Sequence, residues 1–444
     1  MTRVAALVMA LLCSAGVAAQ QPTEGIAGAP LTLRQLEDMA LANNPTVQQA
    51  QAGVDAARGR AQQAGAWPNP IVGYVGEEIA PGEIIQRGAH GVFVDQTIVL
   101  GRKLRLNRDV IEREIAQAES VQERQQLRIV SSVRTRFYEV LTTEQRVAVL
   151  ERLAQLAAEA VGISRQLYNV GAADQPDVLE SNVEARRAQL DVTAARNALN
   201  SVRLQLAALV GDMRVSVRPL AGSIEEAIPE LERDATVQRL IERSPEMRAA
   251  RAAVERARAV VASARRQPFP NLFVRGGVQY NRERLEAGTT PVGWQGLAEV
   301  GVSVPLFNRS QGLVIAARAD QIRAEAERRR LEYQLQSRTA SVFNDYLTAL
   351  RASEVYREEI VPQAELAYRL YLARYREMAA AYPQVLVAQR TLFQMTAAYF
   401  DNLEEAWRTG LRLQGFLVGD GLDAPDRVGD ELGVAIEISP GGER

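Results

Sequence analysis

Hydrophobic and polar residues alternate in four short stretches of the chain. The stretches lie at about 70–80, 91–100, 271–281 and 297–306. In the last of them, apolar Val300 and Val302 alternate with Glu299, which is the period of a β-strand with one apolar face. Alternation alone also fits a half-buried sheet of a soluble protein. Each stretch has about ten residues, however, which is the length of a tilted strand that crosses a membrane.

Helical periodicity occupies most of the remaining chain. Alanine-rich segments at about 32–65 and 234–266 predict helices that end at "WPNP" and "QPFP", because proline stops a helix. Much longer segments, about 103–168 and 311–376, are each followed by a return segment, about 175–210 and 383–416. A helix over 103–168 would reach roughly 100 Å at about 1.5 Å per residue. The pattern therefore predicts two long helical hairpins with solvated, charged outer faces.

The order of predicted elements occurs twice. Pro45 corresponds to Pro245 at an offset of 200, whereas Tyr168 corresponds to Tyr375 at an offset of 207. The change of seven predicts a longer connection between the two strands of the second copy, since loops accept insertions readily. We assign residues 31–215 to a first repeat, 216–233 to a linker and 234–418 to a second repeat.

The two ends of the chain differ from the repeats. Residues 1–19 combine Arg3, a short apolar core and small residues near Ala19, the pattern of a cleaved secretory signal peptide. The only cysteine, Cys13, lies within it, in a context that does not match a lipidation site. We expect a mature chain without disulfides, with flexible segments at 20–30 and 419–444.

Composition argues against several classes of function. The 52 basic residues are balanced by 54 acidic ones, so no broad basic surface for nucleic acid is expected. One histidine, His90, and one cysteine cannot form a zinc or copper site of the usual type. Neither a phosphate-binding loop nor a paired-acid constellation stands out, so we expect no catalysis, no metal site and no cofactor.

Four strands cannot close a barrel, and lipid does not tolerate open sheet edges. A dimer would supply eight strands around a nearly filled interior, and a trimer would supply twelve around an open lumen. The predicted inward residues are polar and suit a water-filled lumen: Arg275, Gln279, Asn281, Glu299 and Ser303. We expect an aromatic girdle near the strand ends, from Trp67, Tyr74, Phe269, Tyr280, Trp294 and Phe307. The alternative is a soluble periplasmic coiled-coil scaffold or adaptor.

Several motifs together resemble the TolC-like outer-membrane efflux proteins, also called outer membrane factors. They are "NNP" at 43–45, "YNVGAADQPDVLE" from Tyr168, "LVG" at 209–211 and "VSVPLFNR" at 302–309, set in the duplicated helix-strand-strand-helix-helix plan. The resemblance covers about residues 31–419. It implies a mainly α fold with a β transmembrane part, assembled as a homotrimer with a twelve-stranded outer-membrane barrel continued by a long periplasmic helical tunnel.

The resemblance also implies a function. Such a protein is the passive exit duct of a tripartite efflux pump, working with a periplasmic adaptor (membrane fusion) protein and an inner-membrane transporter, here of the proton-driven RND type. "DQTIVLGRKLRL" resembles the branch that serves heavy-metal pumps. The alternative is the duct of a type I protein secretion system, and the sequence does not separate export of metals, drugs or polypeptides.

Two sets of residues are candidates for function. The resemblance places the periplasmic tip, where an adaptor docks or a gate closes, at Tyr168, Gly171, Asp174, Asp177, Glu180, Tyr375, Met378 and Gln384. Asp174 and Asp177 are alternatively helix caps. At the strand-to-helix junction, Pro305 is expected where the strand ladder ends, and Gly101 is expected to supply backbone freedom in the first copy. On this interpretation Val304 and Leu306 continue the lipid-facing side of the last strand.

Overall fold

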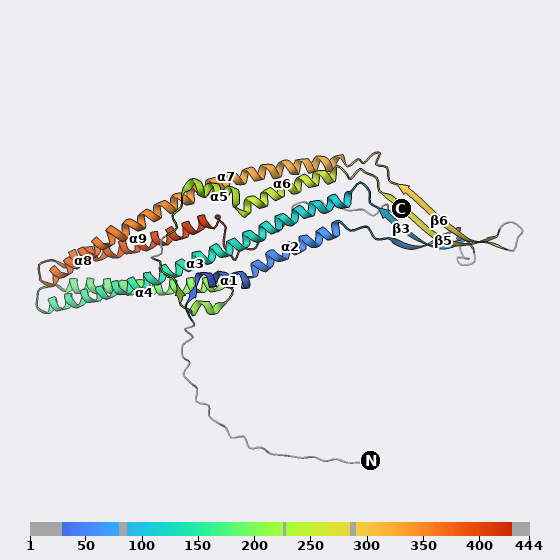
Figure 1. Ribbon diagram of the computed structural model, residues 1–444. Helices are drawn as coiled ribbons and strands as arrows, with labels where there is room; N and C mark the ends of the chain where they lie inside the picture. The colour runs from blue at the N-terminus through green and yellow to red at the C-terminus, as the bar shows by residue number, and fades with distance from the viewer. Residues whose placement is uncertain (1–28, 80–86, 225–227, 285–289, 429–444) are drawn as a thin grey trace, which may run out of the picture.

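The computed structural model describes residues 29–79, 87–224, 228–284 and 290–428. The described chain is elongated, with a sheet at one end and the turns of two helical hairpins at the other (Figure 1). The predicted signal peptide lies outside the described residues. No helix in the described part of the chain combines the length and the hydropathy needed to cross a lipid bilayer.

The same order of elements occurs in both halves. The first half contains α1 (Leu33–Asn43), α2 (Pro45–Ala64), β2 (Ile71–Glu77), β3 (Ala89–Ile98), α3 (Lys103–Asn169) and α4 (Gln175–Val210). The second contains α5 (Arg233–Arg243), α6 (Pro245–Ala264), β5 (Leu272–Arg284), β6 (Pro291–Val302), α7 (Gln311–Val355), the π-helix η2 (Tyr356–Ile360), α8 (Val361–Arg376) and α9 (Tyr382–Gln414). Between them lie the 3₁₀-helix η1 (Met213–Val217) and β4 (Leu220–Ala221), which pairs in parallel with β1 (Leu31–Thr32).

The single helices predicted over 32–65 and 234–266 are each two helices. Asn44 and Ser244 adopt extended backbone conformations that end one helix and cap the next. Asn44 is buried, and its side chain accepts the Thr46 amide at 3.0 Å while donating to the Leu209 carbonyl at 2.9 Å. Proline at the following position starts the second helix because its missing N–H is not needed there.

The long helices are where the sequence predicts them. The helix α3 has 67 residues, and α4 returns beside it. In the second half, α7, the π-helix and α8 run without a break from residue 311 to residue 376. The π-helix ends at Ile360, two residues before Pro362, which lacks an N–H, so a local change of hydrogen-bond pattern accommodates the proline.

The four long strands form one antiparallel sheet in the order β2-β3-β5-β6. The last strand ends earlier than predicted, because Val302 pairs with Leu272, the first residue of β5, and nothing in β5 remains to pair with residues beyond it. Ser303, Val304, Pro305 and Leu306 therefore follow the strand. The strands of the second copy are longer, with 13 and 12 residues against 7 and 10. The predicted longer connection between them is wrong, because residues 285–290 separate β5 from β6 whereas the longer run 78–88 separates β2 from β3.

Residues 419–428 are packed against the first half, which corrects the expectation of a flexible tail from 419 onwards. The Gly421 amide donates to Ser132 Oγ at 2.9 Å, and its carbonyl accepts from Gln125 Nε2 at 3.2 Å. The approach is close because Gly421 has no side chain to strike Ile129. The rest of the predicted tail lies outside the described residues.

The largest core cluster joins the two halves near the middle of the molecule. Tyr138 of α3 stacks on Trp407 of α9 with ring centroids 3.8 Å apart, and Phe137 packs edge-on beside Tyr138. The helix α3 thereby contacts elements of both halves, so the two repeats form one body rather than two separate domains.

Candidate functional site

The two hairpin turns lie at the same end of the molecule and have the same backbone structure (Figure 1). In the first, the Gly171 and Ala172 amides donate to the carbonyls of Tyr168 and Leu167 at 3.0 and 2.8 Å. In the second, the amides of Met378 and Ala379 donate to the corresponding carbonyls of Tyr375 and Arg374, again at 3.0 and 2.8 Å. The turn therefore survives the loss of its glycine in the second copy.

Three tyrosines fill the contact between the hairpins just inside the turns. Tyr368, Tyr375 and Tyr382 are all buried. Tyr375 donates to Ser164 Oγ at 3.3 Å, and Tyr368 donates to the Leu156 carbonyl at 3.2 Å. Burial, and then the charge of Asp177, raises the pKa of Tyr375. Of the predicted tip residues, Tyr375 is thus part of the packing between hairpins.

The remaining predicted tip residues are at the surface. Asp174 occupies the position before α4, but its side chain makes no capping hydrogen bond, so the capping hypothesis is wrong for this residue. Asp177 lies half-buried in the first turn of α4. Tyr168, Gly171, Glu180, Met378 and Gln384 are exposed. Both turns thus present polar and flexible side chains to the solvent at the end of the molecule.

An ion pair that sequence reasoning missed joins the hairpins beside these turns. Arg390 of α9 donates from Nε and Nη2 to Glu184 Oε1 of α4, at 3.0 and 2.5 Å, and Glu184 is buried. Next to Arg390, the buried Gln389 has no hydrogen-bond partner for either side-chain amide atom within the described residues. Glu184 lies in charge-rich helical sequence that resembles solvated surface, whereas Arg390 is the only charged residue between Glu377 and Asp401. No local signal in either stretch indicates that the two residues pair.

The register of the sheet places the predicted polar residues on one face. Arg275 pairs with Glu299 across β5 and β6, with the nitrogen and oxygen 4.0 Å apart, and its guanidinium lies 3.8 Å from the centre of the Phe93 ring. Gln279 and Asn281 follow at the same period in β5. Ser303 is the exception, since it lies beyond β6.

The opposite face of the sheet is apolar and exposed. It carries Val72, Tyr74, Val92, Val94, Val278, Trp294, Val300 and Val302. An uncovered apolar face of this extent marks an interaction surface for lipid or protein. His90 also lies on this face, because β3 begins at Ala89 and not near residue 91 as predicted, and it hydrogen-bonds to the Tyr74 hydroxyl.

The strand-to-helix junction joins the two halves through small and buried residues. Gly101 has φ 70°, and a Cβ atom there would lie 2.8 Å from the Phe269 side chain. Lys103 is buried and donates to Asn271 Oδ1 at 2.9 Å, and this burial lowers the pKa of its ammonium group. Pro305 lies in the segment that leads from β6 to α7. The junction therefore needs Gly101 for backbone conformation and for close packing.

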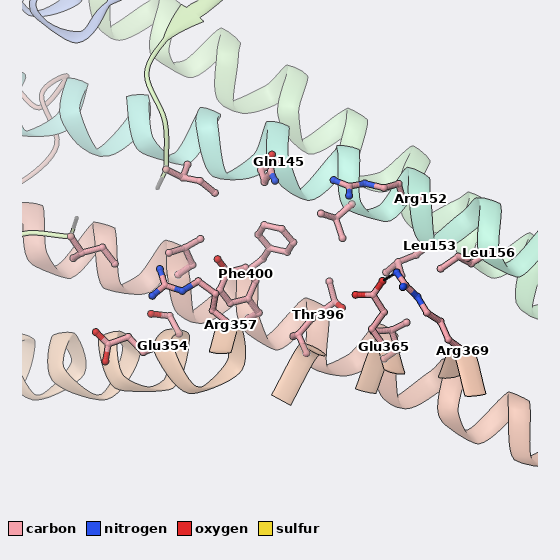
Figure 2. A pocket seen from close by; sticks show the side chains of 18 of the residues that line it. Gln145, Arg152, Leu153, Leu156, Glu354, Arg357, Glu365, Arg369, Thr396 and Phe400 are labelled. Carbon is pink, nitrogen blue, oxygen red and sulfur yellow. Dashed lines mark hydrogen bonds and ion pairs between the residues drawn. The ribbon is translucent and has the colours of Figure 1, made fainter. Parts of the chain in front are cut away.

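A groove of about 860 Å³ runs between the hairpins near the π-helix. Figure 2 shows Arg152 and Leu153 of α3 on one side, with Glu365, Arg369 and Phe400 on the other. Its lining mixes both signs of charge with apolar side chains. Among the described residues no group of three or more His, Cys, Asp or Glu side chains is placed to bind a metal ion.

Comparison with known proteins identifies the class. The family "Outer membrane efflux protein" matches residues 36–212 and again 236–415, and the chain belongs to that family. It is 27% identical over 398 residues to the cobalt-zinc-cadmium resistance protein CzcC of Cupriavidus metallidurans, covering 88% of this chain and 91% of that protein. The predicted family and its role as an outer-membrane efflux protein are confirmed.

Solved structures agree on the fold. The outer-membrane channel OprN superimposes with a TM-score of 0.73 at 18% identity, covering 88% of this chain and 91% of that one. The outer membrane protein VceC of Vibrio cholerae gives 0.71 at 21% identity, covering 88% and 97%. The predicted fold class, long helices joined to a membrane-type sheet, is confirmed.

Proposed function

We propose that three copies of this chain close a twelve-stranded barrel in the outer membrane and continue it as a helical tunnel. The observation that carries the proposal is the open four-stranded sheet, whose edge strands are β2 and β6 and whose one face is apolar and exposed. Unpaired strand edges are not tolerated in lipid. Pairing β2 of one copy with β6 of the next removes every edge and leaves Arg275, Gln279, Asn281 and Glu299 around the lumen.

The helices support the same assembly through the relation between the two repeats. Within one chain, Ile163 of α3 and Leu386 of α9 are buried between the hairpins, at 5% and 8% exposure. Their counterparts 207 residues away are Leu370, 57% exposed, and Leu179, 59% exposed. A neighbouring copy that packs its hairpin against these residues as the two hairpins pack within one chain would bury both leucines. The seam between hairpins is thus formed once inside the chain, and the equivalent seam forms between neighbouring copies.

The tunnel is assigned the role of exit duct in a tripartite pump. The exposed turns, with Asp174, Asp177, Glu180 and Gln384, are the surface for docking a periplasmic adaptor and for gating, and the groove beside the π-helix suits a helical partner. The adaptor in turn connects the duct to a proton-driven inner-membrane transporter. Divalent metal cations are the proposed cargo, on the strength of the similarity to a cobalt-zinc-cadmium resistance protein. The proposal assigns no catalytic step and no cofactor.

Crosslinking tests the assembly. In a Cys13→Ser background, Leu179→Cys and Leu370→Cys on one chain are expected to give crosslinked dimers and trimers in outer-membrane preparations. The matched control is Ile163→Cys with Leu386→Cys, which the structure places at the seam within one chain and which is expected to give no intermolecular product. A chain that stays monomeric in the membrane, or that is released in soluble form by osmotic shock, contradicts the proposal.

Deletion of the gene tests the cargo. Loss of tolerance to cobalt, zinc and cadmium, restored by the wild-type gene, is the expected result. Unchanged metal tolerance with a loss of drug tolerance, or with loss of a secreted polypeptide, contradicts the assignment of metals and identifies the duct with drug efflux or type I secretion instead.

A further inference from the structure

The connections between the sheet and the helices carry a local excess of positive charge. The four junction segments, residues 61–72, 96–108, 261–274 and 301–319, contain no aspartate or glutamate. Their basic residues are Arg102, Lys103, Arg105, Arg108, Arg265, Arg266, Arg309 and Arg318. The chain as a whole has 52 basic and 54 acidic residues, so this distribution is not a reflection of overall composition.

Most of these cations pair with no carboxylate in the described part of the chain, although Arg309 Nε donates to the Leu306 carbonyl at 3.2 Å. Lys103 is buried against Asn271, and Arg108 pairs with Glu112 at 2.9 Å. The other six, which we call the junction arginines, are Arg102, Arg105, Arg265, Arg266, Arg309 and Arg318. All six are exposed, and none is within ion-pair distance of a carboxylate in the described part of the chain. Elsewhere along the helices, arginines commonly pair with nearby acids, as Arg330 does with Glu327 at 2.6 Å.

At the start of α3 the fold gives no reason for this arrangement. Arg102 and Arg105 lie at the start of α3, and neither α3 nor α7 has an acidic residue in its first turn. Cations at the start of a helix are mildly unfavourable because the macrodipole is positive there. Arg102 and Arg105 are therefore placed against the local electrostatic preference, which an external anion would reverse. Arg265 and Arg266 instead lie at the C-terminal end of α6, where the helix dipole favours a cation.

Large apolar side chains are exposed among the junction arginines. Phe307 is 93% exposed two residues before Arg309, and Phe269 is exposed just after Arg266. Trp67, Val304 and Leu306 are also exposed in the same segments. Aromatic rings next to basic residues, at the margin of an apolar surface, are typical of the boundary between membrane and water.

We infer that the junction arginines and these apolar side chains form a belt that binds the anionic headgroups of phospholipids. The inference rests on the proposed function, which puts the apolar face of the sheet in the membrane and the helices in the periplasm. In Figure 1 the junction segments lie between the sheet and the helices. On the proposed function, that position is the level of the periplasmic leaflet. Guanidinium groups bind phosphates in a bidentate manner, and an anionic surface attracts clustered arginines close to it. The ligand class is an anionic phospholipid such as phosphatidylglycerol.

Lipid binding by the purified full chain tests the inference. Vesicles of phosphatidylcholine with phosphatidylglycerol are expected to bind more tightly than pure phosphatidylcholine, and Arg265→Gln with Arg266→Gln is expected to reduce that preference by about tenfold. The matched control is Arg186→Gln with Arg187→Gln, an exposed adjacent pair on α4 far from the sheet. The control is expected to keep the wild-type preference.

Three outcomes overturn the inference. The first is equal loss in both variants, which indicates a general charge effect. The second is complete competition by inorganic phosphate, which indicates a simple anion site rather than a lipid belt. The third is a change in the ion selectivity of the reconstituted channel without any change in lipid preference, which places the arginines in the lumen. Crosslinking of Leu179→Cys with Leu370→Cys in the same preparations separates these results from failure of the proposed assembly.

Discussion

Gly171 and Met378 hold the same left-handed backbone conformation at equivalent points of the two hairpin turns, with φ of 75° and 61°. Only glycine adopts this conformation without a steric cost, which for other residues is roughly 1–2 kcal/mol. The second turn therefore stores strain that the first one lacks, and it does so at the surface proposed for docking and gating.

Met378→Gly is expected to stabilise the second turn by about 1 kcal/mol, because the left-handed conformation becomes unstrained. Hydrogen exchange of the amides around the turn is the measurement, and slower exchange is expected there. Met378→Ala is the control: it removes the long side chain but keeps the strain, so exchange should stay near that of the wild type. Equal slowing in both variants would show that the methionine side chain, and not its backbone, matters.

Glu114 of α3 is an anion shared by arginines of both halves. It is 2% exposed, accepts from Arg60 Nε of α2 at 3.0 Å and lies 2.9 Å from Arg256 Nη2 of α6. Removing one partner of a buried pair leaves the other charge uncompensated, at a cost of about 3–5 kcal/mol. Glu114→Met should therefore lower the apparent melting temperature of the solubilised protein strongly.

The two arginines provide the matched comparison. Arg256 is largely buried, whereas Arg60 is half-exposed and can turn to water. We expect the double variant Glu114→Met with Arg256→Met to regain most of the stability that Glu114→Met loses. Arg60→Met alone is expected to lower the free energy of unfolding by only about 0–1 kcal/mol. A double variant as unstable as Glu114→Met would mean that the carboxylate matters for packing rather than for charge.

Gly101→Ala is expected to weaken the junction between the strands and α3. The added Cβ atom would strain the left-handed backbone conformation and would also clash with the Phe269 side chain. We therefore expect the free energy of unfolding to fall by at least about 1–2 kcal/mol. Gly59→Ala is the control, because Gly59 lies within α2 with nothing within 4 Å of the added atom, and it should stabilise by about 0.5–1 kcal/mol. Thermal unfolding of both variants, followed by circular dichroism, decides the matter.

The stability of the contact between α3 and α9 is expected to rise on mild acidification. Burial, followed by the charges of Glu139 and Asp401, raises the pKa of Glu404 above its ordinary value of 4.5. A carboxyl whose pKa is raised on folding contributes stability that is present below about pH 4.5 and is lost as the pH rises through the folded value.

Glu404→Gln removes that titration. We expect the variant to be more stable than the wild type near neutral pH and to lose the advantage as the pH falls toward 4.5. Melting temperatures measured across this range provide the test. A constant difference at every pH would show that the substitution acts through packing or hydrogen bonding instead.

The sequence by itself determined the repeat, the long hairpins and the alternating strands. These features depend on local periodicity and on the positions of prolines, which act over a few residues. Alternation in β5 and β6 likewise predicted that Arg275, Gln279 and Glu299 share one face. The role of Gly101 at the strand-to-helix junction was also predictable, because a glycine between a strand and a helix usually marks a backbone conformation that other residues rarely adopt.

The tertiary structure decided what depends on neighbours distant in the chain. The end of β6 at Val302 is determined by where β5 begins, and the packing of residues 419–428 depends on the surface of α3. Glu184 and Arg390, 206 residues apart, become an ion pair only because α4 and α9 meet beside the turns. The sequence around each residue does not reveal the pair, since burial and pairing are properties of the packed helices and not of their local pattern.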